Sequence, residues 1–166
     1  MTRPLIVSAL LAKADFAWLD AQRRAHFPAE RNQLPAHLTM LHALPPMVED
    51  ELRDLLRSLT TAEAPPARVA GLMNLGRGVA YRIESAGLLE IREAIAARFH
   101  GMMTAQDAGG WRPHVTIQNK VEPKLAKALL DRLEKDFRPR PLCIEGLTLS
   151  AYDGGPWERL ADYRFR

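Results

Sequence analysis

The chain has 166 residues, 47% of them apolar and 26% charged, a composition that excludes a disordered or fibrous protein. A net charge of +3 permits an anionic ligand, but the sequence has no polybasic tail and no apolar run long enough for a membrane span, so we expect no membrane partner. The single cysteine, Cys143, excludes an intrachain disulfide and a thiolate-rich zinc site, and favours a reducing, cytoplasmic location.

The first half of the sequence alternates between strand and helix patterns. The predicted elements are strand 4–11, helix 14–26, strand 36–43, a helix that begins at Pro46, and strand 68–74. The apolar run of Leu5, Ile6 and Val7 also loosely resembles part of a secretory signal. It is barely long enough for that role, so we interpret it as a buried first strand.

The second half repeats this order. The predicted elements are strand 78–84, a helix that carries Leu88, Ile91, Ile95 and Phe99, strand 114–119, a helix that begins at Pro123, strand 142–152, and a last strand 157–165. A loop is expected over 107–113, where glycines and a proline cluster, and "DGGP" at 153–156 predicts the final turn. We expect these elements to form a single domain over residues 1–166.

An internal repeat links the two halves at an offset of 77 residues. The matching pairs are His37 with His114, Thr39 with Thr116, Pro46 with Pro123, Val48 with Leu125, Leu52 with Leu129, and Leu56 with Leu133. The last three pairs predict equivalent core positions on two helices. The repeat therefore predicts two similar lobes, related by a pseudo-twofold axis.

Each predicted repeat strand carries a histidine two residues before a threonine. Alternate side chains of a strand point to opposite faces, so His37 shares a face with Thr39, and His114 shares one with Thr116. If the lobes pack around a pseudo-twofold axis, these two pairs face each other across a cleft.

The same alternation assigns the neighbouring polar residues to faces. Gln118 and Lys120 are expected on the face of His114, where Lys120 is a candidate phosphate ligand. His42 is expected on the face opposite His37 and is interpreted as structural or solvent-facing. Paired histidines can also hold a metal, but neither motif has a carboxylate inside it, so we expect no metal site.

Such a cleft suits displacement at a phosphodiester. The reaction needs a base on the attacking side and an acid on the leaving side, and two histidines with ordinary pKa values of about 6.5 can supply both near neutral pH. Threonine hydroxyls can donate hydrogen bonds to the non-bridging oxygens, where charge accumulates.

The motifs "HLTM" at 37–40 and "HVTI" at 114–117 resemble the paired His-x-Thr-x motifs of the 2H phosphoesterase superfamily, which includes the RNA 2′,3′-cyclic phosphodiesterases, or 2′-5′ RNA ligases. The resemblance implies a bilobal α+β fold, with two antiparallel sheets lining a central cleft and helices outside. It also implies metal-independent hydrolysis of cyclic phosphodiesters without a cofactor.

Carried over residue by residue, the resemblance makes His37 and His114 the acid/base pair and Thr39 and Thr116 the phosphate donors. We lean towards His114 as the base and His37 as the acid. Many such enzymes have a basic residue shortly after the second motif, a role for which Lys120 is the candidate. Trp111, Tyr152 and Trp157 are candidates for stacking a base.

The expected substrate is an RNA end or a nucleotide with a 2′,3′-cyclic phosphate, and the expected state is a monomer. The reverse reaction would make a 2′-5′ linkage. Two alternatives stay open: a non-catalytic nucleotide- or RNA-binding module on the same fold, and a phosphoesterase for a small metabolite. The duplicated histidines argue against a pure binder, which needs no acid/base pair.

Overall fold

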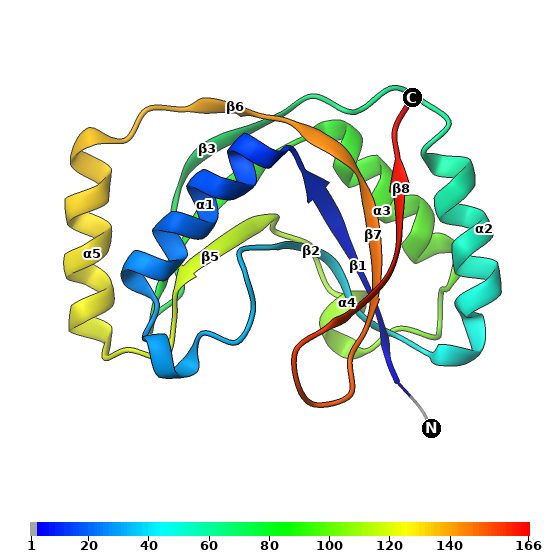
Figure 1. Ribbon diagram of the computed structural model, residues 1–166, viewed down its shortest axis with the longest axis horizontal. Helices are drawn as coiled ribbons and strands as arrows, with labels where there is room; N and C mark the ends of the chain where they lie inside the picture. Colours follow the sequence, from blue (N-terminus) through cyan, green and yellow to red (C-terminus); the bar gives the residue numbers. More distant parts are fainter. Residues whose placement is uncertain (1–2) are drawn as a thin grey trace.

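The computed structural model describes residues 3–166, which form two antiparallel sheets with helices on their outer sides (Figure 1). The strands are β1 Leu5–Leu11, β2 Leu38–Leu44, β3 Ala67–Asn74, β4 Val79–Glu84, β5 His114–Gln118, β6 Arg140–Leu142, β7 Ile144–Ala151 and β8 Glu158–Arg164. The helices are α1 Lys13–His26, α2 Glu49–Leu59, α3 Ala86–Arg98, α4 Ala105–Ala108 and α5 Pro123–Asp136, with short 3-10 turns at Ala29–Arg31 and Pro46–Val48. The predicted α+β class is confirmed.

The two sheets follow one plan. Sheet A has the strand order β2-β1-β7-β8, and sheet B has the order β5-β4-β3-β6. In each sheet a motif strand, β2 or β5, lies at the edge beside the strand that precedes it in the chain. The third strand of each sheet, β7 or β3, comes from the other half of the chain. The two halves therefore repeat the same topology, and each contributes one strand to the sheet of the other.

The first strand lies inside sheet A, where β1 pairs with both β2 and β7. Leu5, Ile6 and Val7 are at most 2% exposed. The interpretation of this run as a buried strand is confirmed.

One predicted strand is wrong. The apolar run 142–152 is not one strand: Arg140–Leu142 pairs with β3 in sheet B, and Ile144–Ala151 pairs with β1 in sheet A. Cys143, between them, is held by hydrogen bonds to Asp15 and Ala12, so the chain crosses between the sheets there. An apolar pattern shows burial but not which sheet a residue joins, and this crossing was therefore missed.

Helix boundaries also differ from the pattern. The predicted loop 107–113 begins inside α4, which Thr104 caps by accepting a hydrogen bond from the Asp107 N–H. Pro46 starts a 3-10 turn, and the α-helix proper begins at Glu49. A four-residue helix carries too little periodicity to be seen in sequence.

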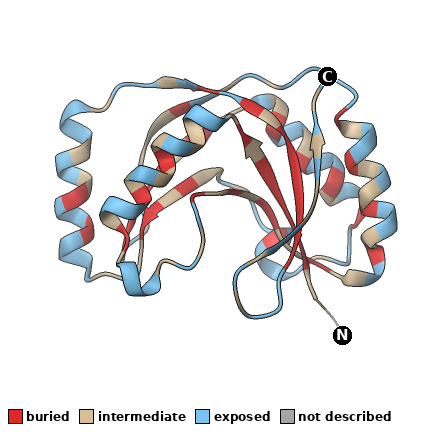
Figure 2. Cartoon of the chain, in the orientation of Figure 1, coloured by how far each residue is buried: buried red, intermediate tan, exposed pale blue. Residues whose placement is uncertain are grey.

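The helices bury one side against the sheets and expose the other (Figure 2). Leu52 and Leu129, predicted to be equivalent core positions, are both buried. The pair Val48 and Leu125 is a correction, because Val48 is 6% exposed but Leu125 is 53% exposed. Among residues 3–166, no helix combines the length and apolar character that crossing a membrane would require.

Each motif strand contains a β-bulge at the same place. In sheet A the register passes from Val7–Leu41 to Ser8–Thr39, which leaves Met40 as the extra residue. In sheet B it passes from Val79–Gln118 to Ala80–Thr116, with one extra residue, Ile117. Met40 and Ile117 are 77 residues apart, so the repeat includes the position of the bulge, which no residue type predicts. A bulge reverses which later side chains face which side.

Candidate active site

The two motif strands lie close together, and a cavity of about 350 Å³ opens beside them. Its lining includes His37, which directly precedes β2, Thr39 from β2, and His114 and Thr116 from β5. The four residues singled out from sequence are therefore brought together around one space, although they come from segments 77 residues apart.

Both motif histidines are held in the same way. Nδ1 of His37 lies 2.8 Å from the carbonyl oxygen of Pro35, and Nδ1 of His114 lies 2.7 Å from that of Arg112. A carbonyl oxygen can only accept, so each Nδ1 carries the proton. Nε2 of each ring is then the atom left for acid or base chemistry, and this needs no carboxylate partner.

The two histidines differ in their surroundings. The ring of His37 packs edge-on against Trp157, with the ring centroids 4.7 Å apart. Burial lowers the pKa of His37 to about 4. The hydrogen bond to Pro35 raises this pKa, and the positive charge of Arg23 lowers it further. His37 is therefore neutral at pH 7, with its Nε2 lone pair free.

The unpaired edges of the motif strands are satisfied by buried side chains. An edge strand leaves backbone groups without a ladder partner, and burying them unpaired would be costly. Arg23 of α1 donates to the Thr116 carbonyl at 3.0 Å, and Arg92 of α3 donates to the Met40 carbonyl at 3.1 Å. Each helix thus binds the motif strand of the other half.

Trp111 extends this arrangement. Its indole N–H donates to the Thr39 carbonyl at 3.1 Å, and its ring lies 5.9 Å from the guanidinium of Arg92. Trp111 also lines the cavity, as does Trp157. Tyr152, the third aromatic candidate, lines neither this cavity nor its larger neighbour.

His42 is the main correction at the site. The sequence predicted it to face away from His37, but the bulge at Met40 reverses the alternation, a second register shift places His42 and Ala43 opposite the single residue Ile6, and His42 lines the same cavity. Its Nδ1 donates to Asp107 at 3.0 Å, and Asp107 is 1% exposed. Because bulges have no reliable sequence signature, simple alternation could not place His42.

Asp107 holds the end of β2 as well as the ring. Its carboxylate accepts hydrogen bonds from the backbone N–H groups of His42 and Ala43, at 2.8 to 2.9 Å. Burial raises the pKa of Asp107, but the bonds from His42 and Ala43 outweigh it and bring the pKa below its ordinary value. The carboxylate is therefore ionised at neutral pH.

Gln118 and Lys120, which were expected on the face of His114, do not line the cavity. The bulge at Ile117 turns Gln118 inward, where it is buried, so its predicted position beside His114 is wrong. Lys120 is exposed in a turn with φ of 63° and does not line the cavity. The arginines that do line it, Arg92 and Arg112, were not identified from sequence, since neither belongs to a motif.

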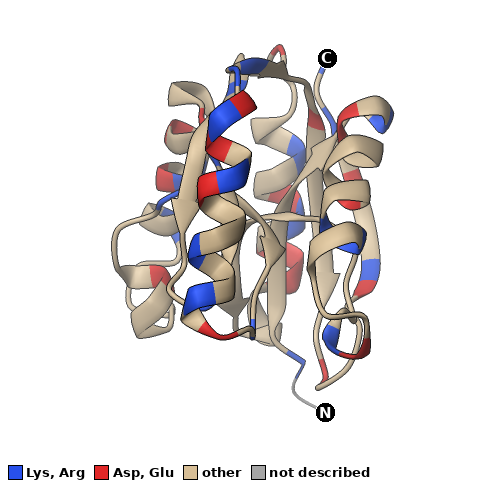
Figure 3. Cartoon of the chain, turned by 90° about the vertical axis from the view of Figure 1, so that its left-hand side faces the viewer, with Lys and Arg blue, Asp and Glu red and all other residues tan. Residues whose placement is uncertain are grey.

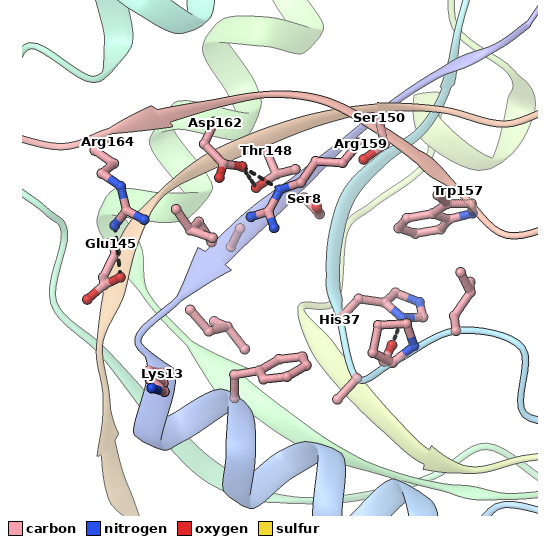
Figure 4. Close-up of a pocket in the computed structure, with 17 residues that line it drawn as sticks. Ser8, Lys13, His37, Glu145, Thr148, Ser150, Trp157, Arg159, Asp162 and Arg164 are labelled. Atoms are coloured by element: carbon pink, nitrogen blue, oxygen red, sulfur yellow. Dashed lines mark hydrogen bonds and ion pairs between the residues drawn. The ribbon is translucent and has the colours of Figure 1, made fainter.

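A larger cavity of about 490 Å³ lies next to the first and shares His37 and Trp157 with it (Figure 4). Its wall is a row of polar residues across sheet A. Thr39 pairs with Ser8, and Ser8 pairs with Thr148. The Thr148 hydroxyl donates to Asp162 at 2.8 Å, and Arg159 donates to the same carboxylate.

The corresponding row of sheet B is apolar. Thr116 pairs with Ala80, and Ala80 pairs with Met73. Ala80 and Met73 are both buried, and neither lines either of the two cavities. Within residues 3–166, no cluster of three His, Cys, Asp or Glu side chains could hold a metal ion.

Comparison with known proteins adds the family. The model of the 2′-5′ RNA ligase superfamily matches residues 11–156, whereas no curated protein matches the chain significantly. A Thermus thermophilus structure, TT0787, is 19% identical, with 98% of each chain covered and a TM-score of 0.65. Escherichia coli LigT complexed with 3′-AMP is 18% identical, with 99% of each chain covered and a TM-score of 0.61.

A further structure, described as a phosphoesterase, is 17% identical with a TM-score of 0.55 and 98% coverage of both chains. Identities this low establish the shared fold, while the family rests on the matched model. With its paired His-x-Thr-x motifs on equivalent edge strands, this chain belongs to the 2′-5′ RNA ligase superfamily, that is, to the 2H phosphoesterases.

Proposed function

We propose that the protein hydrolyses 2′,3′-cyclic phosphates on RNA ends or nucleotides, without a metal, through His37 and His114. The observation that carries this proposal is the pair of rings at one cavity, each with Nδ1 tied to a backbone carbonyl and Nε2 left for the substrate. The threonine two residues after each histidine lines the same space.

In the proposed reaction, a water attacks phosphorus while one histidine takes its proton. The bond between phosphorus and one ribose oxygen breaks, and the other histidine donates a proton to that oxygen. The lowered pKa of His37 supports it as the base and leaves His114 as the acid. This reverses the order towards which the sequence leaned. The reverse reaction would use the same two residues to join ends as a 2′-5′ linkage.

The threonine hydroxyls and the arginines act on charge rather than on protons. Thr39 and Thr116 would donate to the non-bridging oxygens, and Arg92 and Arg112 would favour an anion in the cavity. Placing donors in advance where charge develops is usually the largest single contribution to such catalysis.

The larger cavity supports a nucleotide over a small metabolite. Its volume of about 490 Å³ leaves room for a nucleoside beside the reacting phosphate. Trp157 lies at the junction as a stacking surface, and Ser8 and Thr148 offer hydroxyls along the wall. Structures of LigT hold 3′-AMP, NADP+, ATP or phosphate.

The outer surface supports a short footprint on RNA. On the side shown in Figure 3, basic and acidic residues are interspersed along the helices. A long nucleic-acid contact would normally need a continuous basic stripe. The single domain, the monomeric state and the cytoplasmic location remain predictions from the sequence.

The test is turnover of nucleoside 2′,3′-cyclic phosphates and of an oligonucleotide with a cyclic-phosphate end, in excess EDTA. Wild type should hydrolyse both, and His37→Ala and His114→Ala should each lose roughly 10²- to 10⁴-fold in kcat. Turnover that survives both substitutions would contradict the mechanism. Turnover abolished by EDTA would indicate a metal-dependent reaction. Binding without turnover would support the alternative of a non-catalytic nucleotide- or RNA-binding module.

A further inference from the structure

We propose that His42, held by Asp107, forms a second phosphate site in the catalytic cavity and binds the 5′-phosphate of the nucleotide whose cyclic phosphate reacts. This rests on the proposed function. It narrows the substrate class to nucleotides that carry a 5′-phosphate, as every nucleotide within an RNA chain does, rather than lone nucleoside cyclic phosphates.

The hydrogen bond between His42 and Asp107 occupies Nδ1 and leaves Nε2 as the ring atom for a ligand. With Nδ1 bonded to the Asp107 carboxylate, a neutral ring would present only a lone pair at Nε2. A protonated ring donates at both nitrogens, to the carboxylate on one side and to an anion on the other. The same oxygen of Asp107 also accepts the backbone N–H of His42, and the other oxygen accepts the N–H groups of His42 and Ala43, so the ring and the strand are fixed together.

The charge of the cavity exceeds what one phosphodiester requires. Three histidines, His37, His42 and His114, line it together with Arg92 and Arg112. The described residues that line it include no carboxylate, and Asp107 lies behind His42 rather than at the surface. A cyclic phosphate carries one negative charge, whereas the guanidinium groups of Arg92 and Arg112 carry two positive charges, so the cavity suits a ligand with a second phosphate.

The position of His42 fits a neighbouring phosphate. It lies three residues beyond Thr39 on β2, and a strand advances about 3.3 Å per residue, so the two positions are separated by roughly 10 Å or slightly less across the bulge. The reacting phosphate is placed between Thr39 and Thr116. His42 lines the same cavity of about 350 Å³.

The second lobe has no such group. Asn119 occupies the equivalent position, 77 residues after His42, but β5 has already ended at Gln118. The Asn119 side chain accepts a hydrogen bond from the Lys120 N–H and does not line the cavity. The extra phosphate therefore has one place to bind, which gives the substrate a single direction across the pseudo-symmetric site.

Two substrates that differ by one phosphate provide the test: adenosine 2′,3′-cyclic phosphate with and without a 5′-phosphate. His42→Phe keeps both backbone bonds to Asp107 and removes only the ring N–H groups. It should raise KM about tenfold for the 5′-phosphorylated substrate, the usual effect of losing a hydrogen bond to a charged group, and leave KM for the other unchanged. His100→Phe, the same change at an exposed histidine, should alter neither.

Two kinetic results would reject the inference. An equal rise of KM for both substrates would place His42 on the reacting phosphate, and unchanged kinetics for both would make the ring purely structural. Thermal unfolding of each variant shows whether the fold is intact. His42→Gln, which keeps a donor, should recover part of the lost discrimination.

Binding separates this inference from the proposed function. If wild type turns over neither substrate, the proposed function fails, and calorimetry with adenosine 3′-phosphate and adenosine 3′,5′-bisphosphate still tests the site. Wild type should bind the bisphosphate about tenfold more tightly, and His42→Phe should bind the two equally. Equal affinities in wild type would overturn the second phosphate site.

Discussion

The two motif strands are alike in their chemistry and different in what surrounds them. Each places a histidine and a threonine at one cavity, ties Nδ1 to the carbonyl two residues earlier, and carries a bulge at the same position. Beyond that point β2 continues to His42, while β5 ends at Gln118. The two motif strands therefore share their histidine, threonine and bulge, and they differ in the residues that follow.

The rows that run across the sheets show the same contrast. From Thr39 the row continues through Ser8 and Thr148 into an open cavity, whereas from Thr116 it continues through buried Ala80. A pseudo-symmetric centre with one open side can bind an asymmetric substrate in one orientation. In the proposed function, both lobes therefore take part in the reaction, and sheet A provides most of the contacts that recognise the substrate.

The largest expected effect tests the shared chemistry. If the two histidines act in one step, the double variant His37→Ala/His114→Ala should be no slower than the worse single variant, because residues that act as a unit are not additive. Single-turnover rates with a cyclic-phosphate substrate measure this. A double variant slower by the product of the two single effects would show that the lobes act independently.

The next effect separates the two buried arginines. Arg23→Met and Arg92→Met each leave a buried carbonyl without its donor, which should cost about 1–3 kcal/mol of unfolding free energy. Arg92 also lines the cavity, so only Arg92→Met should lower turnover beyond its effect on folding. Denaturant unfolding and kinetics measure both, with Arg24→Met as the exposed control. Equal losses of activity in Arg23→Met and Arg92→Met would contradict the expected difference between the two arginines.

A third effect concerns pH and stability. Since burial lowers the pKa of His37 to about 4, the unfolded chain binds a proton between about pH 6.5 and 4 that the folded chain does not. Stability should therefore fall as the pH drops through this range, by on the order of 2 kcal/mol. His37→Asn should flatten this dependence in denaturant titrations at several pH values. An unchanged slope would remove the distinction between the two histidines.

The smallest expected effect tests the polar row. Thr148→Val keeps the shape of the side chain but removes a hydroxyl from the wall of the larger cavity, so KM for a nucleotide substrate should rise roughly fivefold, the effect of one lost hydrogen bond. Thr60→Val, which removes a buried hydroxyl from the residue that follows α2, is the matched control. If Thr148→Val left KM unchanged, sheet A would not be the recognition side.

Much of the fold and of the candidate site could be predicted from local patterns in the sequence. The repeat offset placed the histidine and threonine of each motif, and Leu52 and Leu129 in the core, because periodicity and residue type report burial directly. Leu125 shows the limit: it keeps the helical spacing, but its counterpart Val48 has a neighbour to pack against and Leu125 is left at the surface. Periodicity indicates which face is apolar, not how far the partner surface extends.

By itself, the sequence determined the alternation of strands and helices, the two lobes and the paired motifs, since all of these depend on spacing along the chain. Tertiary structure decided which residues meet. Two bulges brought His42 to the cavity and took Gln118 away from it, and packing delivered Arg92 and Asp107 to β2 from distant helices. Such contacts depend on register and on long-range packing, which strand alternation within one segment cannot reveal.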